Sequence, residues 1–331
     1  MSESDLYEFN ITRSGDRLSA TPLPCECLWT STPMDINYVT LCQIDELMCL
    51  RVDHPQAKAL IALQGAQLLE YTPTGEQPVI WLSELAEFKK GKSIRGGIPI
   101  CWPWFGDARK NPESVQKHLP KGALPAHGWV RDKPWLLEWA ASDEERVHLR
   151  FRFPTNIWPA PFPNGVELSV EMRIGTTLQM CLTTNNQSDQ TVNFSQALHS
   201  YFAISDVGSV QIGDLEGVTY IDTLDDWQEN SSDTPLAIAE EVDRIYVDTP
   251  KVITIADSRW QRTVQLTSPD AKSAVVWNPW IEKSKRLGQF ADDAYERMVC
   301  VESGNTANKS LLLREQAAGH LRINVGLRCP D

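Results

Sequence analysis

Long stretches in which apolar and polar residues alternate are the feature that most constrains how this chain can fold. Residues 147–153, VHLRFRF, place an apolar side chain at every second position, and residues 166–174, VELSVEMRI, keep this pattern across nine residues. Successive side chains of a β-strand point to opposite faces, so the pattern indicates strands with one buried face. Gly175 and two threonines then lead into residues 178–184, LQMCLTT, which predicts a hairpin partner for 166–174.

Further strands are predicted where short runs are rich in β-branched residues. These runs are residues 252–256, 273–277, 298–302 and 321–326. The best helical signal is short and covers residues 81–88, WLSELAEF, where Ser83 is placed to cap one turn. Many closely spaced strands, with 18 glycines and 21 prolines available for turns, predict an all-β sandwich.

The size and composition of the chain predict one large domain. Its 331 residues, 42% of them apolar and 23% charged, are enough to bury a substantial core. Neither a low-complexity linker nor a repeat of fixed period divides the sequence. Residues 1–35 are less regularly patterned than the rest. We therefore predict an N-terminal arm over residues 1–35 and a single β-domain over residues 36–331.

The net charge and the polar start of the chain limit its partners and its location. The formal net charge is -13 and no run of lysine or arginine interrupts it, so no nucleic-acid partner is expected, because phosphate-backbone binding needs a basic face. A small anionic ligand is still compatible with this net charge, since a few cationic side chains in a pocket can attract it locally. No apolar run could span a bilayer and no signal-peptide pattern is present, so we predict no membrane partner and a cytoplasmic location. The default expectation is a monomer.

The sequence contains none of the usual spacings of metal, nucleophile or nucleotide sites. Its six histidines form neither HxH nor HExxH, and its eight cysteines form no CxxC pair. We therefore predict reduced thiols and no metal ion. A GxSxG elbow, a GxGxxG after a strand and a GxxxxGK[ST] loop are also absent from the sequence, so we expect no cofactor.

Isolated polar residues in aromatic surroundings are the remaining candidates for chemistry. His127 lies in LPAHGWVRD, His199 lies in QALHSYFAI, and Glu302 closes a predicted strand before a predicted turn at residues 303–305. A carboxylate at such a junction is well placed to reach a cleft. The plainer interpretation makes the histidines hydrogen-bonded core residues and the glutamate a solvated strand end. Spacing alone leaves both interpretations open.

An arginine and a group of tryptophans suggest a cleft with aromatic walls. Arg95 precedes Gly96-Gly97 and is followed by the aromatic run CWPWF at residues 101–105. Flat aromatic rings suit the apolar C–H faces of sugars, although core packing is the plainer role for tryptophan and loop anchoring is the plainer role for Arg95. Six tryptophans lie in Pro-rich or Gly-rich contexts: Trp102, Trp104, Trp129, Trp135, Trp277 and Trp280.

Six motifs in one order closely resemble those of the D-hexose-6-phosphate mutarotases, the glucose-6-phosphate 1-epimerase branch of the aldose 1-epimerase superfamily. The motifs are RGGIPICWPWFG (95–106), PAHGWVRD (125–132), LHSYFAI (198–204), LEGVTYID (215–222), VVWNPW (275–280) and MVCVESGN (298–305). The similarity runs from about Val52 to about Val325. It implies a β-supersandwich, the galactose mutarotase-like fold, which agrees with the alternation.

The resemblance also implies roles for single residues. His199 resembles the general acid of the family and Glu302 its general base. The substrate-binding residues that it implies are Arg95 as a phosphate ligand, Arg131 adding positive field, Asp222 on sugar hydroxyls, His127 as a second active-site histidine, and Gln67. Asp225 and Asp226 stay open as alternatives to Asp222. Thr223 stands where relatives commonly carry lysine, which leaves the sugar or phosphate contacts there open.

The implied reaction interconverts the α and β anomers of hexose 6-phosphates by opening and closing the ring. A base takes the proton of the C1 hydroxyl while an acid protonates the ring oxygen, without metal or redox cofactor. We expect Glu302 to be ionised and His199 to supply a proton near neutral pH. We also expect Gly96-Gly97 to let the backbone approach the ligand. The alternatives are a non-catalytic carbohydrate-binding module and a regulatory β-sandwich; the preferred hexose phosphate cannot be read from the sequence.

Overall fold

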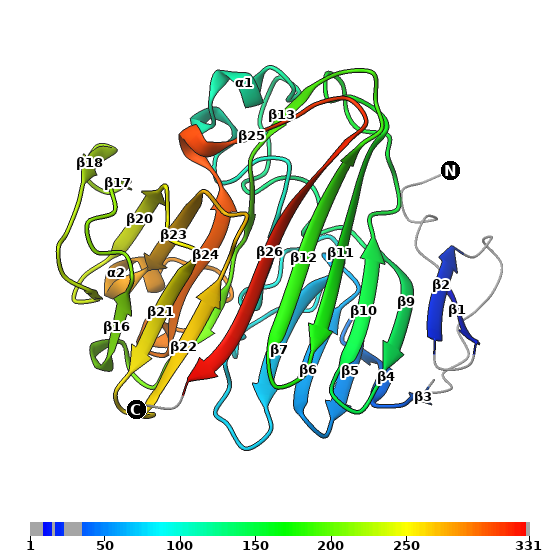
Figure 1. The fold of residues 1–331 in the computed structure, drawn as a ribbon, viewed down its shortest axis with the longest axis horizontal. Coiled ribbons are helices and arrows are strands. Elements are labelled where there is room, and N and C mark those ends of the chain that lie inside the picture. Colours follow the sequence, from blue (N-terminus) through cyan, green and yellow to red (C-terminus); the bar gives the residue numbers. More distant parts are fainter. Residues whose placement is uncertain (1–8, 15–16, 23–34, 329–331) are drawn as a thin grey trace.

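The computed structural model of the protein describes residues 9–14, 17–22 and 35–328, and these residues form mainly antiparallel strands (Figure 1). The largest sheet contains, in spatial order, β1 (Phe9–Ser14), β2 (Arg17–Pro22), β9 (Leu136–Ser142), β10 (Val147–Arg152), β11 (Val166–Ile174), β12 (Leu178–Asn186), β26 (Ala317–Arg328), β22 (Arg262–Thr267), β21 (Val252–Asp257), β16 (Val210–Gly213) and β19 (Leu236–Ala237).

Three smaller sheets complete the described strands. An eight-stranded sheet contains β18 (Gln228–Asn230), β17 (Tyr220–Asp222), β20 (Val242–Val247), β23 (Ser273–Asn278), β24 (Met298–Asn305), β14 (Gln196–Leu198) and β8 (Ile100–Cys101), with β15 (Tyr201–Ala203) paired to β24. A five-stranded sheet contains β3 (Asp35–Ile36), β4 (Val39–Ile44), β5 (Leu47–His54), β6 (Ala57–Ala62) and β7 (Gln67–Pro73), and β13 (Val192–Phe194) pairs with β25 (Leu311–Leu313). The α-helices are short: α1 (Glu113–Gln116) and α2 (Trp280–Ser284).

The all-β prediction and the strands predicted from alternation are confirmed. In β11, buried and partly exposed residues alternate along the strand, as the sequence pattern requires. β11 and β12 form the predicted hairpin, in which Ile174 pairs with Leu178. The N–H group of Gly175 donates to the carbonyl of Thr177 to close the turn.

The core lies between the large sheet and the sheets behind it. In Figure 1, β4 to β7 lie behind β9 to β12, and one buried apolar cluster joins both layers, including Leu50 and Ile61 from one side and Phe151 and Val170 from the other. Such burial is the dominant favourable contribution to folding. The single domain over residues 36–331 stays a prediction.

Two local predictions are wrong. Residues 81–88 form no helix; they form a turn in which Ser83 Oγ accepts the N–H of Leu85. Trp81 instead packs into a buried aromatic cluster, and this tertiary packing overrides the weak helical signal. Residues 303–305 do not turn, because β24 continues to Asn305 and pairs there with β14.

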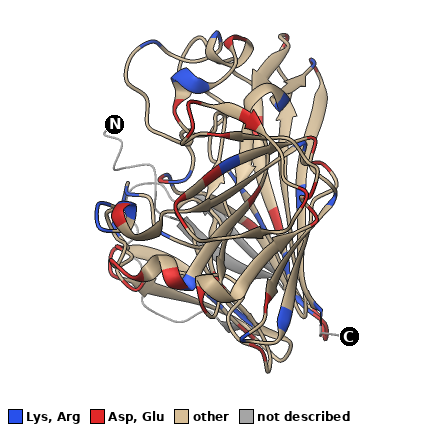
Figure 2. Ribbon diagram, turned by 90° about the vertical axis from the view of Figure 1, so that its left-hand side faces the viewer, with Lys and Arg blue, Asp and Glu red and all other residues tan. Residues whose placement is uncertain are grey.

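Much of the predicted N-terminal arm lies outside the described residues. Its described parts, β1 and β2, form a hairpin at the edge of the large sheet, where Leu18 pairs with Ala140 of β9. None of the helices in the described part of the chain has the length and apolarity needed to cross a bilayer. Figure 2 shows basic and acidic residues interspersed over one side of the molecule.

Candidate active site

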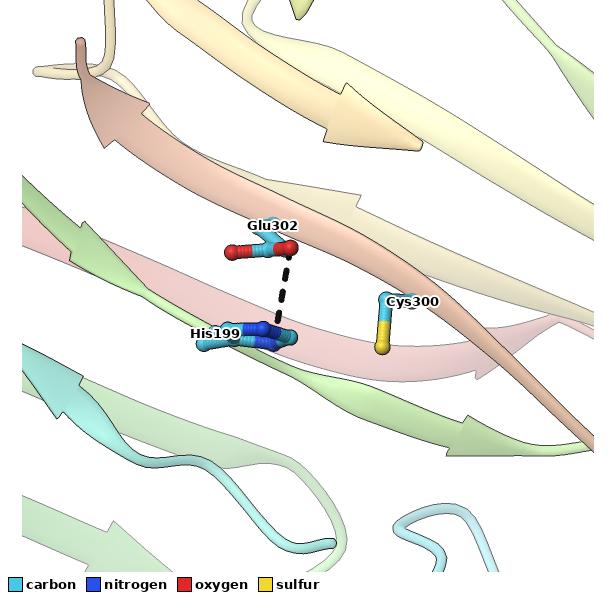
Figure 3. Close-up of side chains that lie close together, drawn as sticks. All are labelled: His199, Cys300 and Glu302. Atoms are coloured by element: carbon cyan, nitrogen blue, oxygen red, sulfur yellow. Dashed lines mark ion pairs between the residues drawn. The ribbon is translucent and has the colours of Figure 1, made fainter. Parts of the chain in front are cut away.

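His199 and Glu302 face each other because two short strands pair with β24 in one continuous register. β14 pairs with residues 303–305 of β24, and β15 pairs with residues 298–300. His199 lies between β14 and β15, so this register puts it opposite Glu302. Cross-strand neighbours have Cβ atoms about 4.5–5.5 Å apart, and here the side chains meet. Nδ1 of His199 lies 3.4 Å from Oε1 of Glu302 (Figure 3).

The pair lines a cavity of about 330 Å³ over one face of the eight-stranded sheet. Residues two apart on a strand share a face, and the cavity is lined in this way by Asp243 and Ile245 on β20 and by Val275 and Trp277 on β23. The cross-strand register places Val275 beside Glu302. Other segments contribute Arg95, Phe105, Lys110, His127, Tyr201 and Trp227.

Burial controls the protonation of the pair. The exposed fraction is 7% for His199 and 1% for Glu302, and neither Nδ1 of His199 nor Oε2 of Glu302 has a hydrogen-bond partner among the described residues. Desolvation, reinforced by the charge of Asp243, raises the pKa of Glu302 well above its ordinary value. Desolvation, reinforced by His127 and two arginines, lowers the pKa of His199 well below its ordinary value.

These directions are the reverse of the expected protonation, in which Glu302 is ionised and His199 is cationic. The reason is the loss of water around both groups, which disfavours each charged form. A carboxylate with an imidazolium and a carboxylic acid with an imidazole nevertheless hold the same number of protons. The two states differ only in which side chain carries one proton, and the atoms concerned are 3.4 Å apart. The two groups are therefore close enough to exchange protons with one substrate molecule.

His127 adds a second imidazole to the cavity. Its ring centroid is 5.4 Å from that of His199, and its Nδ1 accepts the N–H of Gly106 at 3.3 Å. Desolvation, with Arg131 and Arg95 nearby, lowers the pKa of His127 to about 3. A neutral imidazole whose Nδ1 accepts a backbone N–H carries its proton on Nε2. His127 is therefore suited to donate a hydrogen bond to a ligand.

Arg95 is held against the cavity by an aromatic neighbour. Its Nη1 donates to the hydroxyl of Tyr201 at 3.4 Å, and the Tyr201 ring stacks on His199 with centroids 4.8 Å apart. Within residues 35–328, neither Arg95 nor Arg131 forms an ion pair with a carboxylate. Arg131 is not among the residues lining the cavity, but its charge opposes protonation of both histidines. Both arginines thus direct positive field toward the site.

The fold itself requires the glycines after Arg95. A Cβ atom on Gly96 would lie 2.7 Å from the carbonyl oxygen of Trp81, and a Cβ atom on Gly97 would lie 2.2 Å from that of Leu68. Both glycines also have positive φ angles, which other residues rarely adopt. Close approach to neighbouring segments thus accounts for both glycines, and the approach of this backbone to a ligand stays a prediction.

Gln67 supports Arg95 from beneath. Its side chain is fully buried and is not among the residues lining the cavity. Its Nε2 donates to the carbonyl of Gly96 at 2.7 Å and to that of Ile94 at 3.3 Å. These two carbonyls flank Arg95, so Gln67 is placed to position the arginine and not to contact substrate.

Besides Glu302, the carboxylates that line the cavity are Asp107 and Asp243, and the predicted Asp222 is not among them. Asp222 accepts the N–H of Leu224 and lies 3.4 Å from Arg244, and it is not among the cavity residues. Neither are the alternatives Asp225 and Asp226. Strand alternation explains the difference, since Asp243 shares a face of β20 with Ile245 and points with it into the cavity.

Several of the aromatic residues predicted to wall a cleft belong to the core instead. Trp102, Trp104 and Trp135 are fully buried, and Nε1 of Trp102 donates to Thr184 on β12. Phe105 and Trp277 do line the cavity, together with Trp227, which the sequence did not single out. Nζ of Lys110 lies 5.2 Å from the centre of the Trp227 ring, so these two residues meet at the cavity wall.

The residues that sequence reasoning missed carry weak signals. Tyr201 lies two residues after His199, which is the spacing of a shared strand face, but both residues fall in a run too apolar to show a period. Asp243 is the second residue of the run VDRIYV, whose alternation is broken by consecutive buried residues. Lys110 ends a three-residue 3-10 helix and Trp227 lies in a turn, and no periodic pattern indicates where such side chains point.

The family described as aldose 1-epimerase matches residues 48–321 of this chain. The chain belongs to the aldose 1-epimerase family. Among its relatives, an Escherichia coli K12 protein that is provisionally named a glucose-6-phosphate 1-epimerase is 34% identical over 285 residues, covering 86% of this chain and 91% of the relative.

Solved structures agree with the family and confirm the galactose mutarotase-like fold. A crystal structure from Salmonella typhimurium, provisionally titled a mutarotase, is 31% identical, has a TM-score of 0.79, and covers 88% of this chain and 94% of its own. A galactose mutarotase-like protein from Clostridium acetobutylicum shares the fold at 13% identity, with a TM-score of 0.67 and coverage of 88% and 99%.

Proposed function

We propose that this protein is a glucose-6-phosphate 1-epimerase that interconverts the α and β anomers of hexose 6-phosphates. The observation that carries the proposal is the buried pair of His199 and Glu302, 3.4 Å apart in a cavity of about 330 Å³. That volume lies within the usual range of about 300–1,000 Å³ for small-molecule sites. The provisional names of the relatives at 34% and 35% identity point to the same substrate.

Two groups suffice for the chemistry. Glu302 takes the proton of the C1 hydroxyl while His199 protonates the ring oxygen, which opens the hemiacetal. After rotation about C1–C2 the same two protons return and the ring closes on its other face. Each positioned proton transfer accelerates a reaction by about 10²–10⁴-fold. Because the pair regains its starting protonation at ring closure, no proton has to be exchanged with solvent.

A bound phosphorylated substrate would itself favour the form of the pair in which His199 is protonated and Glu302 is ionised. Arg95 and Arg131 oppose an imidazolium at position 199, and a bound phosphate would offset these two positive charges. The negative group thus makes protonation of His199 less costly when substrate is present. Carboxylate Asp243 and the neutral His127 are available to hydrogen-bond the sugar hydroxyls. A phosphorylated hexose therefore fits the electrostatics better than a free sugar does.

The proposal is tested by NMR magnetisation transfer between the anomers of glucose 6-phosphate and of glucose. We expect acceleration for glucose 6-phosphate that greatly exceeds the acceleration for glucose. Glu302→Gln should lose this acceleration. Glu144→Gln, which removes one carboxylate from an exposed turn, is its matched control and should exchange the anomers as the wild type does. A sugar phosphate that raises the melting temperature without any exchange would replace the proposal with the carbohydrate-binding alternative. The cytoplasmic location and the monomeric state stay predictions.

A further inference from the structure

Three side chains that can bind a metal ion meet where His199 and Glu302 line the cavity. A ring nitrogen of His199, the sulfur of Cys300 and a carboxylate oxygen of Glu302 all lie within 4.8 Å of one another. Cys300 and Glu302 are two residues apart on β24, so their side chains share one face, and His199 approaches that face from the neighbouring segment (Figure 3). All three residues are more than nine-tenths buried.

Two of these donors have unused binding capacity. Nδ1 of His199 and Oε2 of Glu302 have no hydrogen-bond partner among the described residues, although both are buried. Buried polar atoms without partners are uncommon and call for an explanation. Imidazole nitrogen, thiolate sulfur and carboxylate oxygen together form a ligand set that Zn²⁺ accepts.

We propose that His199, Cys300 and Glu302 form an inhibitory Zn²⁺ site. Tetrahedral Zn²⁺ has ligand distances of about 2.0–2.3 Å, which places its donors roughly 3.3–3.8 Å apart. The three donors, which lie within 4.8 Å of one another, therefore have to close by about 1.5 Å at most. One thiolate and one carboxylate balance the charge of the ion, and the fourth position stays available to water. Mg²⁺ and Ca²⁺, which prefer oxygen ligands, do not suit this set.

The surrounding charges act in both directions. Arg95 and Arg131 repel a cation, whereas Asp243 attracts one. Inhibition rests on the proposed function, because the ion engages the two groups that move protons. A sugar phosphate would place its C1 hydroxyl and ring oxygen against the same two groups, so Zn²⁺ and glucose 6-phosphate exclude each other.

No local spacing in the sequence indicates this site. Histidine-rich and CxxC spacings place ligands within one short segment, whereas here His199 comes from a different segment and reaches Cys300 and Glu302 through the register between strands. The prediction of no metal cofactor is a separate matter, since the proposed ion arrests the reaction and takes no part in it.

Isothermal titration calorimetry of metal-free full-length protein with Zn²⁺ tests the proposal. We expect saturable binding that glucose 6-phosphate weakens, and no such binding of Mg²⁺. Cys300→Ser and Cys300→Ala should each weaken Zn²⁺ binding by at least about 10-fold, because loss of even an outer partner costs about 10–100-fold. His320→Ala removes an exposed histidine, and Cys25→Ser/Cys27→Ser removes a pair of thiols that could chelate zinc; both should bind Zn²⁺ as the wild type does.

X-ray absorption of the wild-type complex gives a readout that does not depend on how well the variants fold. We expect one sulfur neighbour at about 2.3 Å from the ion. Absence of sulfur, or equal Zn²⁺ affinity in Cys300→Ser and wild type, overturns the site. Anomer exchange without metal is measured separately. Anomer exchange by a protein that does not bind Zn²⁺ would overturn this inference and leave the proposed function standing. Zn²⁺ binding by a protein that does not exchange the anomers would overturn the proposed function alone.

Discussion

Replacement of Arg95 by alanine tests whether the cavity selects a phosphorylated sugar. The Arg95 guanidinium lines the cavity, donates to Tyr201 at 3.4 Å and has no carboxylate partner within the described residues. An arginine in this state can donate charge-assisted hydrogen bonds to a phosphate without first breaking an ion pair. Alanine removes that contact and leaves the His199–Glu302 pair in place.

The expected loss follows from the energy of such a contact. A hydrogen bond to a charged group contributes about 1.5–3 kcal/mol, and each 1.4 kcal/mol is about tenfold in affinity. Arg95→Ala should therefore raise KM for glucose 6-phosphate by about 10–100-fold. The rate with glucose should change by less than about threefold, since glucose has no phosphate to lose. NMR magnetisation transfer over a range of substrate concentrations gives both values.

Arg259→Ala is the matched control, because it removes the same charge from an exposed site. It should leave both substrates unaffected at physiological ionic strength, where exposed charges are screened within about 8 Å. Equal losses for glucose and glucose 6-phosphate in Arg95→Ala would refute the phosphate role. An effect of Arg259→Ala as large as that of Arg95→Ala would assign the loss to net charge and not to contact.

Three further predictions concern acidity, the cavity carboxylate and the core. The unfolded chain binds a proton on His127 near pH 6.5, whereas the folded chain binds it only near pH 3. The free energy of unfolding should therefore fall by about 1.4 kcal/mol per pH unit as the pH falls between these values. Chemical denaturation should show a shallower fall for His127→Asn, and an equal fall would contradict the desolvation of this histidine. Asp243→Asn removes a negative charge that raises the pKa of Glu302. The part of the pH–rate profile that reports ionisation of Glu302 should therefore move to lower pH. An unchanged profile would show that Asp243 does not act on Glu302. Trp102→Phe leaves the Thr184 hydroxyl without the indole N–H that it accepts. Urea denaturation should show a loss of about 1–3 kcal/mol in the free energy of unfolding. A raised KM with unchanged stability would instead show that Trp102 contacts the substrate.

The regular part of the fold follows from the sequence because one buried face imposes alternation. β10, β11 and β12 are predicted nearly to the residue, since each covers the core with every second side chain. Residues 81–88 are not predictable in the same way, because the position of Trp81 depends on packing against Tyr201 and Phe290, which come from distant segments.

The candidate site follows from the sequence only through resemblance. Its two central residues are 103 positions apart, and their meeting depends on β14 and β15 sharing one register with β24. No local pattern encodes that register. For the same reason the sequence does not single out Asp243, because its place in the cavity depends on which face of its strand it occupies. The protonation of the pair depends on burial, which a sequence does not show residue by residue.

The Glu302→Gln variant tests the central claim most directly, because glutamine keeps the shape of the side chain and cannot carry the proton. The measurement is the rate at which this variant exchanges the anomers of glucose 6-phosphate. We predict that the wild type accelerates exchange strongly and that the variant, folded and still able to bind glucose 6-phosphate, loses about 10²–10⁴-fold of that rate. Exchange at the wild-type rate in Glu302→Gln would contradict a mechanism that moves protons between this carboxyl group, the sugar and His199.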